Sequence, residues 1–198
     1  MDLVDRIETT RFIGVEFLSW LWFKVELFDG SFDLADGRRA DLWVDTRLVL
    51  ALWTAPTEKA TLSGMAPSTG AEATAALQQG KVPVKAALRL IVDENEYAFS
   101  FDAQRFALSG VRMPALTAAE SEERFLERMM LLEKLDEVWV SLYDEFLSLR
   151  LSGLWESEVA PAMREWVQGR LTLSPDSYAA LLERSTRTKA AVARDKRR

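Results

Sequence analysis

The 198-residue sequence contains neither histidine nor cysteine. Without cysteine, the chain has no disulfide framework, no thiolate nucleophile and no cysteine-ligated zinc. Without histidine, the Ser-His-Asp triad and every histidine-ligated metal site are excluded as well. Carboxylates are therefore the only groups left for catalysis or metal binding, and we expect a binding protein rather than an enzyme.

The common nucleotide-binding signatures are also missing. Gly80-Lys81 is followed by Val82, where a P-loop requires Ser or Thr, and Ala75 stands where the first P-loop glycine should be. No G-x-G occurs in the chain, so the dinucleotide fingerprint is absent. None of the lysines has an acidic residue two positions earlier, as the acid-x-Lys pattern of magnesium-dependent nucleases requires. We therefore expect no cofactor and no small-molecule substrate.

One acidic turn could hold a hard cation through Asp93, Glu94 and Glu96. Adjacent acids in a hairpin turn are more often simply solvated, and we predict no metal site. A carboxylate-only metal hydrolase is the enzyme class that this turn leaves open.

The most apolar window runs from Phe12 to Leu27 and is too short for a membrane-spanning helix. Its length is about 16 residues, against the ~20 needed to cross a bilayer, and it contains Glu16, Lys24 and Glu26. The N-terminal MDLVDRIETT lacks the charged region and apolar run of a signal peptide. We predict a cytoplasmic protein with no membrane partner.

Charge is distributed unevenly around the net value of −6. The last 16 residues, Glu183 to Arg198, contain seven Lys or Arg and two acids (7 − 2 = +5), so the rest of the chain carries −11 (−6 − 5). This balance argues against a simple basic nucleic-acid binder. A local basic surface, however, decides affinity for phosphate, so nucleic acid stays open as a partner.

The N-terminal region, residues 1–33, is expected to be helical and rich in tryptophan. A short helix is predicted over Asp2 to Thr10 and a longer one over Phe12 to Phe28, where apolar residues recur every three or four positions. Asp29-Gly30 should end the second helix.

Residues 34–114 have the texture of a sheet, with a turn at Asp36-Gly37 and many β-branched and aromatic residues. A helix over 68–80 interrupts it, capped by Ser68 or Thr69 and ended by Gly80. The turn Asp93-Glu94-Asn95 should join two of the strands. The predicted strands are Trp43-Val44, Arg47 to Trp53, Ala60 to Ser63, Val82 to Val92, Tyr97 to Asp102 and Ala107 to Arg112.

Residues 115–182 are predicted to be helical, and 183–198 to form a basic tail. Thr117 and Glu120 form a capping-box pattern at the start of a long helix that should end near Gly153. A helix over Leu154 to Gly169 should be bent or begin at Pro161, and Ser174 should cap a last helix with Pro175 at its first position. The fold class is therefore α+β, a mostly antiparallel sheet with an inserted helix, in a single domain over 1–198.

The long helix carries an apolar stripe more than thirty residues in length. Core packing is its commonest role, but a small sheet cannot cover a stripe of this length completely, which favours a homodimer. The many acids of the same helix indicate an exposed polar face. The stripe consists of Phe125, Met129, Leu132, Leu135, Trp139, Leu142, Phe146 and Leu149.

Two groups of cations are candidate contacts for nucleic acid. Lys81, Lys85 and Arg89 lie at even spacing on one predicted strand, so their side chains should share a face that suits a phosphate backbone. The second group is the C-terminal arm, for which a solubilising tail is the alternative. It includes Arg194, Lys196, Arg197 and Arg198, preceded by Arg184, Arg187 and Lys189.

The stretch from Ser68 to Pro114 resembles the C-terminal half of the bacterial recombination-associated RdgC family. The resemblance lies in EATAALQQGK, in the following VPVKAALRLIVDE and YAFSFDAQRFAL, and in the earlier FLSWLWFKVE. It implies an acidic protein that encircles duplex DNA as a dimer without sequence preference and moderates RecA-dependent recombination. Lys81 then matches a DNA-facing lysine of the family, and Lys85 a second strand lysine.

Two departures from the family pattern accompany this resemblance. Gly64, Met65 and Ala66 replace polar and basic residues of the family, and its N-terminal half has no counterpart here. On the basis of the resemblance, we expect an RdgC-like, nucleoid-associated DNA-binding protein. The alternative is a protein-interaction or oligomerisation module of the same fold that does not bind DNA.

Overall fold

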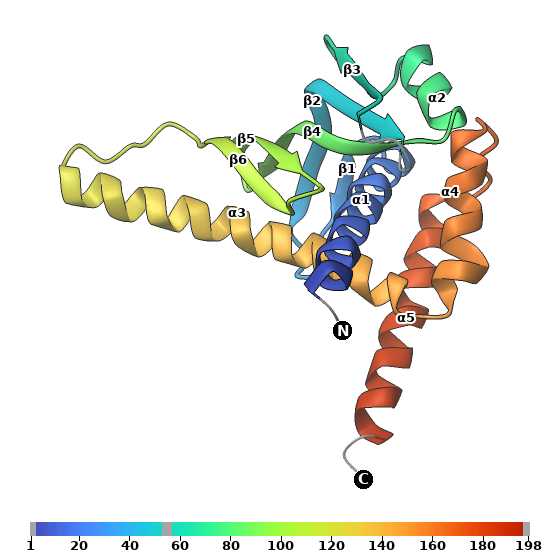
Figure 1. The fold of residues 1–198 in the computed structure, drawn as a ribbon. Coiled ribbons are helices and arrows are strands. Elements are labelled where there is room, and N and C mark those ends of the chain that lie inside the picture. Colours follow the sequence, from blue (N-terminus) through green and yellow to red (C-terminus); the bar gives the residue numbers. More distant parts are fainter. Residues whose placement is uncertain (1–2, 53–56, 196–198) are drawn as a thin grey trace. The chain divides into compact units, whose positions relative to one another are not determined.

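The computed structural model describes residues 3–52 and 57–195, with side chains over 13–52 and 57–186 (Figure 1). The chain packs as two compact units, Met1–Trp139 and Val140–Arg198, and we describe each by itself. The expectation of a single domain stays a prediction.

The first unit begins with α1, one continuous helix over Leu3–Leu27. The prediction of two separate helices was wrong. Thr10 and Arg11 stand at the expected break, and neither is a glycine or proline that would interrupt the backbone hydrogen bonds. The predicted end is confirmed: Asp29 and Gly30 have φ angles of 52° and 81°, which turn the chain out of the helix.

All pairings in the six-stranded sheet are antiparallel, in the order β1-β2-β4-β5-β6 with β3 on the open edge of β2. The predicted α+β class is thereby confirmed. The short β1 was not predicted, and β2 is one strand where two were expected. The strands are β1 (Ser31–Asp33), β2 (Arg39–Leu52), β3 (Lys59–Ser63), β4 (Lys81–Val92), β5 (Asn95–Asp102) and β6 (Ala107–Arg112); Trp53, assigned to a strand from sequence, lies outside the described residues.

The prediction of two strands in place of β2 was wrong, because the pairing of β2 with β4 is irregular in the middle of one continuous strand. Val44 pairs with Leu88 and Leu48 with Ala86, so β2 has two more residues than β4 between these pairs. Such a bulge interrupts the apolar alternation without ending the strand. On its other edge β2 pairs with β1 before this point and with β3 after it.

Two local turns show which sequence signals were correct. Asp93 and Glu94, with φ angles of 48° and 65°, make the tight turn between β4 and β5. Between β3 and β4, α2 (Ala71–Gln78) begins after Gly70 without any side-chain cap, so the capping roles of Ser68 and Thr69 were wrong. The Thr69 hydroxyl instead donates to the Ala66 carbonyl at 3.0 Å. Gly80, at φ 79°, follows the end of α2 as predicted.

The core of this unit lies between α1 and one face of the sheet. The Phe17 ring packs edge-on against Phe101, with centroids 5.8 Å apart. Gly14 allows the closest approach, because a Cβ there would lie 2.0 Å from the Ala103 carbonyl oxygen. We call this the core face; it also carries Leu48 and Ala86, while the outer face carries Val49, Lys85 and Arg89.

The long helix α3 spans Ser121–Arg150. It begins after Glu120, so Thr117 does not cap it; Thr117 lies in the preceding loop and bonds to Glu127. It ends three residues before Gly153, near the predicted end. The loop after β6 runs out to the N-terminal end of α3, whose first turns lie beyond the sheet (Figure 1).

The second unit contains the end of α3, the π-helical turn η1 (Trp155–Val159), α4 (Ala160–Val167) and α5 (Pro175–Asp195). Pro161 lies in the first turn of α4, as predicted. Ser174 caps α5 as expected, since its Oγ accepts the Ser177 amide at 3.2 Å. None of the helices in the described residues has both the length and the apolarity that crossing a bilayer requires.

Candidate functional site

The three cations predicted to share a face of β4 do not do so. Val49 pairs with Lys85, and the next residue, Leu50, pairs with Pro83, so Val84 is an extra residue in β4. An inserted residue reverses the alternation of side chains along a strand. Lys81 therefore has the parity of Pro83 and Leu50, on the core-face side, while Lys85 and Arg89 remain on the outer face.

Arg89 is also engaged by acids. Its guanidinium contacts Asp45 on β2 at 3.2 Å and Glu96 on β5 at 2.9 Å. Two carboxylates at these distances neutralise the cation locally, so little of its charge is available to a phosphate. The sequence reading missed this because both acids approach from neighbouring strands.

The register places three other cations on the outer face. Lys85 lies beside Val49, which pairs on its other side with Thr61. Arg47 and Lys59 lie on the same outer face, two residues to either side of this pair: Arg47 is opposite Ser63, and Lys59 is opposite Ala51. All three are exposed, and none makes an ion pair with any residue in the described part of the chain. We call Arg47, Lys59 and Lys85 the cation cluster. Only strand register identifies it, because its members are far apart in sequence.

The C-terminal arm stays a prediction. Arg194 belongs to the last turn of α5, and its side chain is not described. Lys196, Arg197 and Arg198 lie outside the described residues. Arg184, near the start of the arm, forms an ion pair with Glu158 at 2.6 Å.

The acidic turn is occupied by ion pairs. Asp93 contacts Lys134 at 3.0 Å and Arg38 at 3.7 Å, and Glu96 contacts Arg89. Within residues 3–52 and 57–195, no three or more Asp or Glu side chains are grouped as a metal site.

The most unusual surface of the first unit lies on the N-terminal half of α3. Five large apolar side chains are exposed there within eight residues, and we call them the α3 face. They are Phe125 (63% exposed), Leu126 (60%), Met129 (49%), Met130 (69%) and Leu132 (36%). Periodicity predicted Phe125, Met129 and Leu132 as part of an apolar stripe, but it predicted neither Leu126 and Met130 nor the exposure of the face.

The α3 face is exposed because the helix meets the sheet only beyond it. Leu135, Val138 and Trp139 are buried, and the Trp139 ring lies 5.0 Å from Phe101 and 5.5 Å from Phe99. The three preceding turns have no such aromatic contact with the sheet among the described residues, and their apolar side chains remain in solvent.

A carboxylate clamp holds these exposed turns in order. The Glu127 carboxylate accepts the backbone N–H groups of Thr117 and Ala118 at 2.9 to 3.0 Å and the Thr117 hydroxyl at 2.8 Å. The N–H bonds from Ala118 and then Thr117 lower the pKa of Glu127 below its ordinary value, because they stabilise the charged form. The loop before α3 is thereby fixed along the helix.

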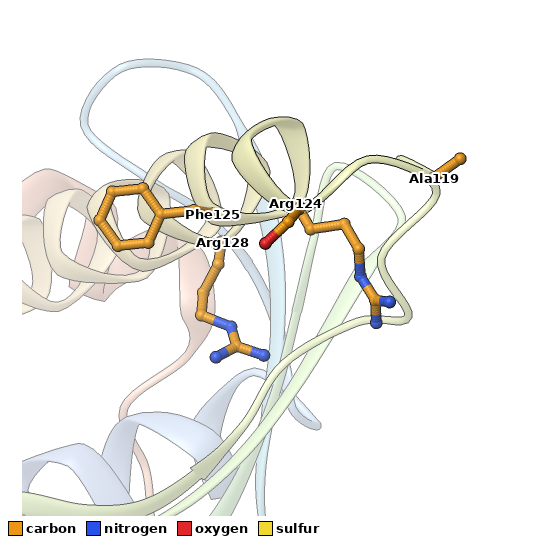
Figure 2. A pocket seen from close by; sticks show the side chains of 5 residues that line it. Ala119, Arg124, Phe125 and Arg128 are labelled. Carbon is orange, nitrogen blue, oxygen red and sulfur yellow. The ribbon is translucent and has the colours of Figure 1, made fainter.

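Between this loop and α3 lies an open hollow of about 390 Å³, lined by Ala119, Ser121, Arg124, Phe125 and Arg128. Figure 2 shows Arg124 and Arg128 extending from one side of the helix while the Phe125 ring extends from another. The two cations therefore line the hollow, and the α3 face borders it through Phe125.

Comparison with known protein families, with curated proteins and with solved structures finds no match to this chain.

Proposed function

We propose that this protein is a non-catalytic binding module that docks another polypeptide on the α3 face. The observation that carries this proposal is the exposure of five large apolar side chains on one ordered helix. Together they present on the order of 400–500 Å², taking about 100 Å² for each half-exposed side chain of this size. A patch of that area on a soluble protein is often an interaction site.

The clamp at Glu127 supports a binding role rather than a frayed helix end. Thr117 and Ala118 are tied to the helix through three donors, so the first turns of α3 are ordered before any partner arrives. A preorganised surface loses less conformational entropy on binding. The apolar rows at three- and four-residue spacing fit the packing of one helix against another.

Selection from a peptide display library tests this proposal. Helical peptides with a fixed apolar stripe and random flanks are selected on the wild-type chain, and the survivors are measured on the double variant Leu126→Glu/Met130→Glu. We expect binding to fall at least tenfold. Met65→Glu is the matched control, since Met65 is 99% exposed but lies outside the α3 face. A selection without binders that depend on the α3 face overturns the proposed function.

A second candidate function is nucleoid-associated, non-specific binding of duplex DNA at the cation cluster. The resemblance to the RdgC family favours it, as do three exposed cations without ion pairs in the described part of the chain. Anisotropy of labelled duplex at low salt is expected to show binding that weakens with added salt and with Arg47→Ala/Lys85→Ala. The effect of Lys81→Ala on the same binding tests whether Lys81, which matches a DNA-facing lysine of the RdgC family, contacts DNA from the other side of the strand. Absence of binding at low salt contradicts this candidate.

A further inference from the structure

We infer that the partner of the α3 face is a short apolar helix or segment with lysine or arginine at both ends. This inference rests on the proposed function and adds the chemistry of the partner. Its basis is the arrangement of carboxylates around the five apolar side chains.

Acids bracket the α3 face along the helix axis. Glu122 lies four residues before Leu126, and Glu133 lies four residues after Met129, so each falls in line with the apolar rows. Asp136 continues the row of Leu132. All three carboxylates are exposed. Glu122 and Glu133 are about 16 Å apart along the axis, at 1.5 Å per residue.

These acids have charge to offer a partner, whereas other charges of the helix are engaged. Glu122, Glu133 and Asp136 make no ion pair with a described residue, while Lys134 is paired with Asp93 at 3.0 Å and Glu137 with Arg38 at 3.3 Å. Arg124 and Arg128 line the hollow together with Phe125, and their side chains extend in another direction than the Phe125 ring (Figure 2). The α3 face is therefore apolar in the middle with acids at both ends, and Arg128 lies along its edge, three residues after Phe125 and four before Leu132.

A second copy of the chain does not complement this pattern. Antiparallel pairing of two α3 helices about Met129 sets Glu122 of one opposite Asp136 of the other, and parallel pairing sets each acid opposite itself. Both arrangements bring like charges together, which is unfavourable. The same acids would repel an anionic membrane or a nucleic acid at this surface, because the charges have the same sign.

The area also fits a short partner. One side of a stable dimer interface buries about 800 Å², roughly twice what the α3 face presents. A helix with cations eleven residues apart matches the 16 Å spacing. An extended segment matches it with cations about five residues apart. Either arrangement places one cation over each acidic end.

The charges on the selected peptides test this inference. We expect Lys or Arg to be enriched at both ends, and expect the affinity to fall at least tenfold on Glu122→Lys/Glu133→Lys and with rising salt. Glu58→Lys/Glu72→Lys is the control, because it changes net charge equally at exposed sites elsewhere. Unchanged melting of each variant shows that it folds.

The outcomes separate the inference from the proposed function. Peptides that need Leu126 and Met130 but bind with neutral or acidic ends, within twofold on the charge-reversed variant, overturn the inference and leave the proposed function standing. A dimer in sedimentation that the double variant Leu126→Glu/Met130→Glu dissociates would overturn the inference, because the partner of the α3 face would then be a second copy of the chain. If no peptide binds in a way that depends on the α3 face, both the proposed function and the inference are overturned.

Discussion

The two stretches of α3 have the same apolar periodicity and opposite surroundings. Between Phe125 and Leu132 five large apolar side chains are exposed, whereas Leu135, Trp139 and Leu142 in the following turns are buried. Helical spacing shows that a face is apolar, but burial depends on whether another element reaches it. The exposed stretch is therefore available for binding, and the covered stretch serves folding.

Trp139 anchors the covered stretch, and removing its side chain should have the largest effect. Its ring lies 5.3 Å from Phe17, 5.0 Å from Phe101 and 5.5 Å from Phe99. Trp139→Ala should lower the free energy of unfolding by about 3–5 kcal/mol, through lost burial and a cavity. Denaturant unfolding measures this change. Trp139→Phe should recover part of the loss; equal losses in both variants would contradict the anchoring role.

Gly14 tests the opposite side of the same core. A Cβ at this position would lie 2.0 Å from the Ala103 carbonyl oxygen, so α1 must move away from the sheet in Gly14→Ala. We expect a loss of about 1–3 kcal/mol, although alanine favours the helix by about 1 kcal/mol. Thermal or denaturant unfolding measures it. Gly70→Ala is the control, since nothing lies within 4 Å of a Cβ there; a stabilised Gly14→Ala would refute the close approach.

Much of the fold was predictable because its signals are local. Alternation in Tyr97, Phe99 and Phe101 gave β5, and Ser174-Pro175 gave the start of α5. The start of α3 was misplaced because Thr117 and Glu120 have the spacing of a cap, while the actual partner of Thr117 is Glu127, ten residues later.

The candidate sites were less predictable because they depend on strand register and on which helix faces other elements bury. Even spacing placed Lys81 with Lys85, and one extra residue at Val84 separated them. The cation cluster joins three strands, and no local pattern relates Arg47 or Lys59 to Lys85. Phe125, Met129 and Leu132 of the α3 face belong to the predicted stripe, but only the path of the sheet determines that they are exposed.

The clamp at Glu127 is expected to have a local effect on the exposed stretch alone. Glu127→Ala should increase hydrogen exchange at Thr117, Ala118 and the first turns of α3, because the amides lose their acceptor. Exchange around Trp139 should not change. Glu127→Gln, which keeps one acceptor oxygen, should be intermediate; faster exchange throughout the unit would contradict a local clamp.

The clamp should also depend on pH in one direction. The folded-state pKa of Glu127 is lowered by the Ala118 and Thr117 bonds, so its contribution is present above the unfolded pKa. It is lost as pH falls through the lowered folded pKa. The amide chemical shifts of Thr117 and Ala118 in a pH titration report this midpoint. A midpoint at or above the ordinary glutamate pKa of about 4.3 would contradict the clamp.

The smallest expected effect on stability comes from the α3 face itself. Leu126→Ser/Met130→Ser removes apolar side chains that are 60% and 69% exposed. The free energy of unfolding should change by under about 0.5 kcal/mol per site, because these groups are largely in water in the folded and unfolded states alike. The same change at buried Leu135 should cost several times more. A loss above about 2 kcal/mol in the double variant would mean that the α3 face packs within the chain, and the distinction between the two stretches of the helix would then fail.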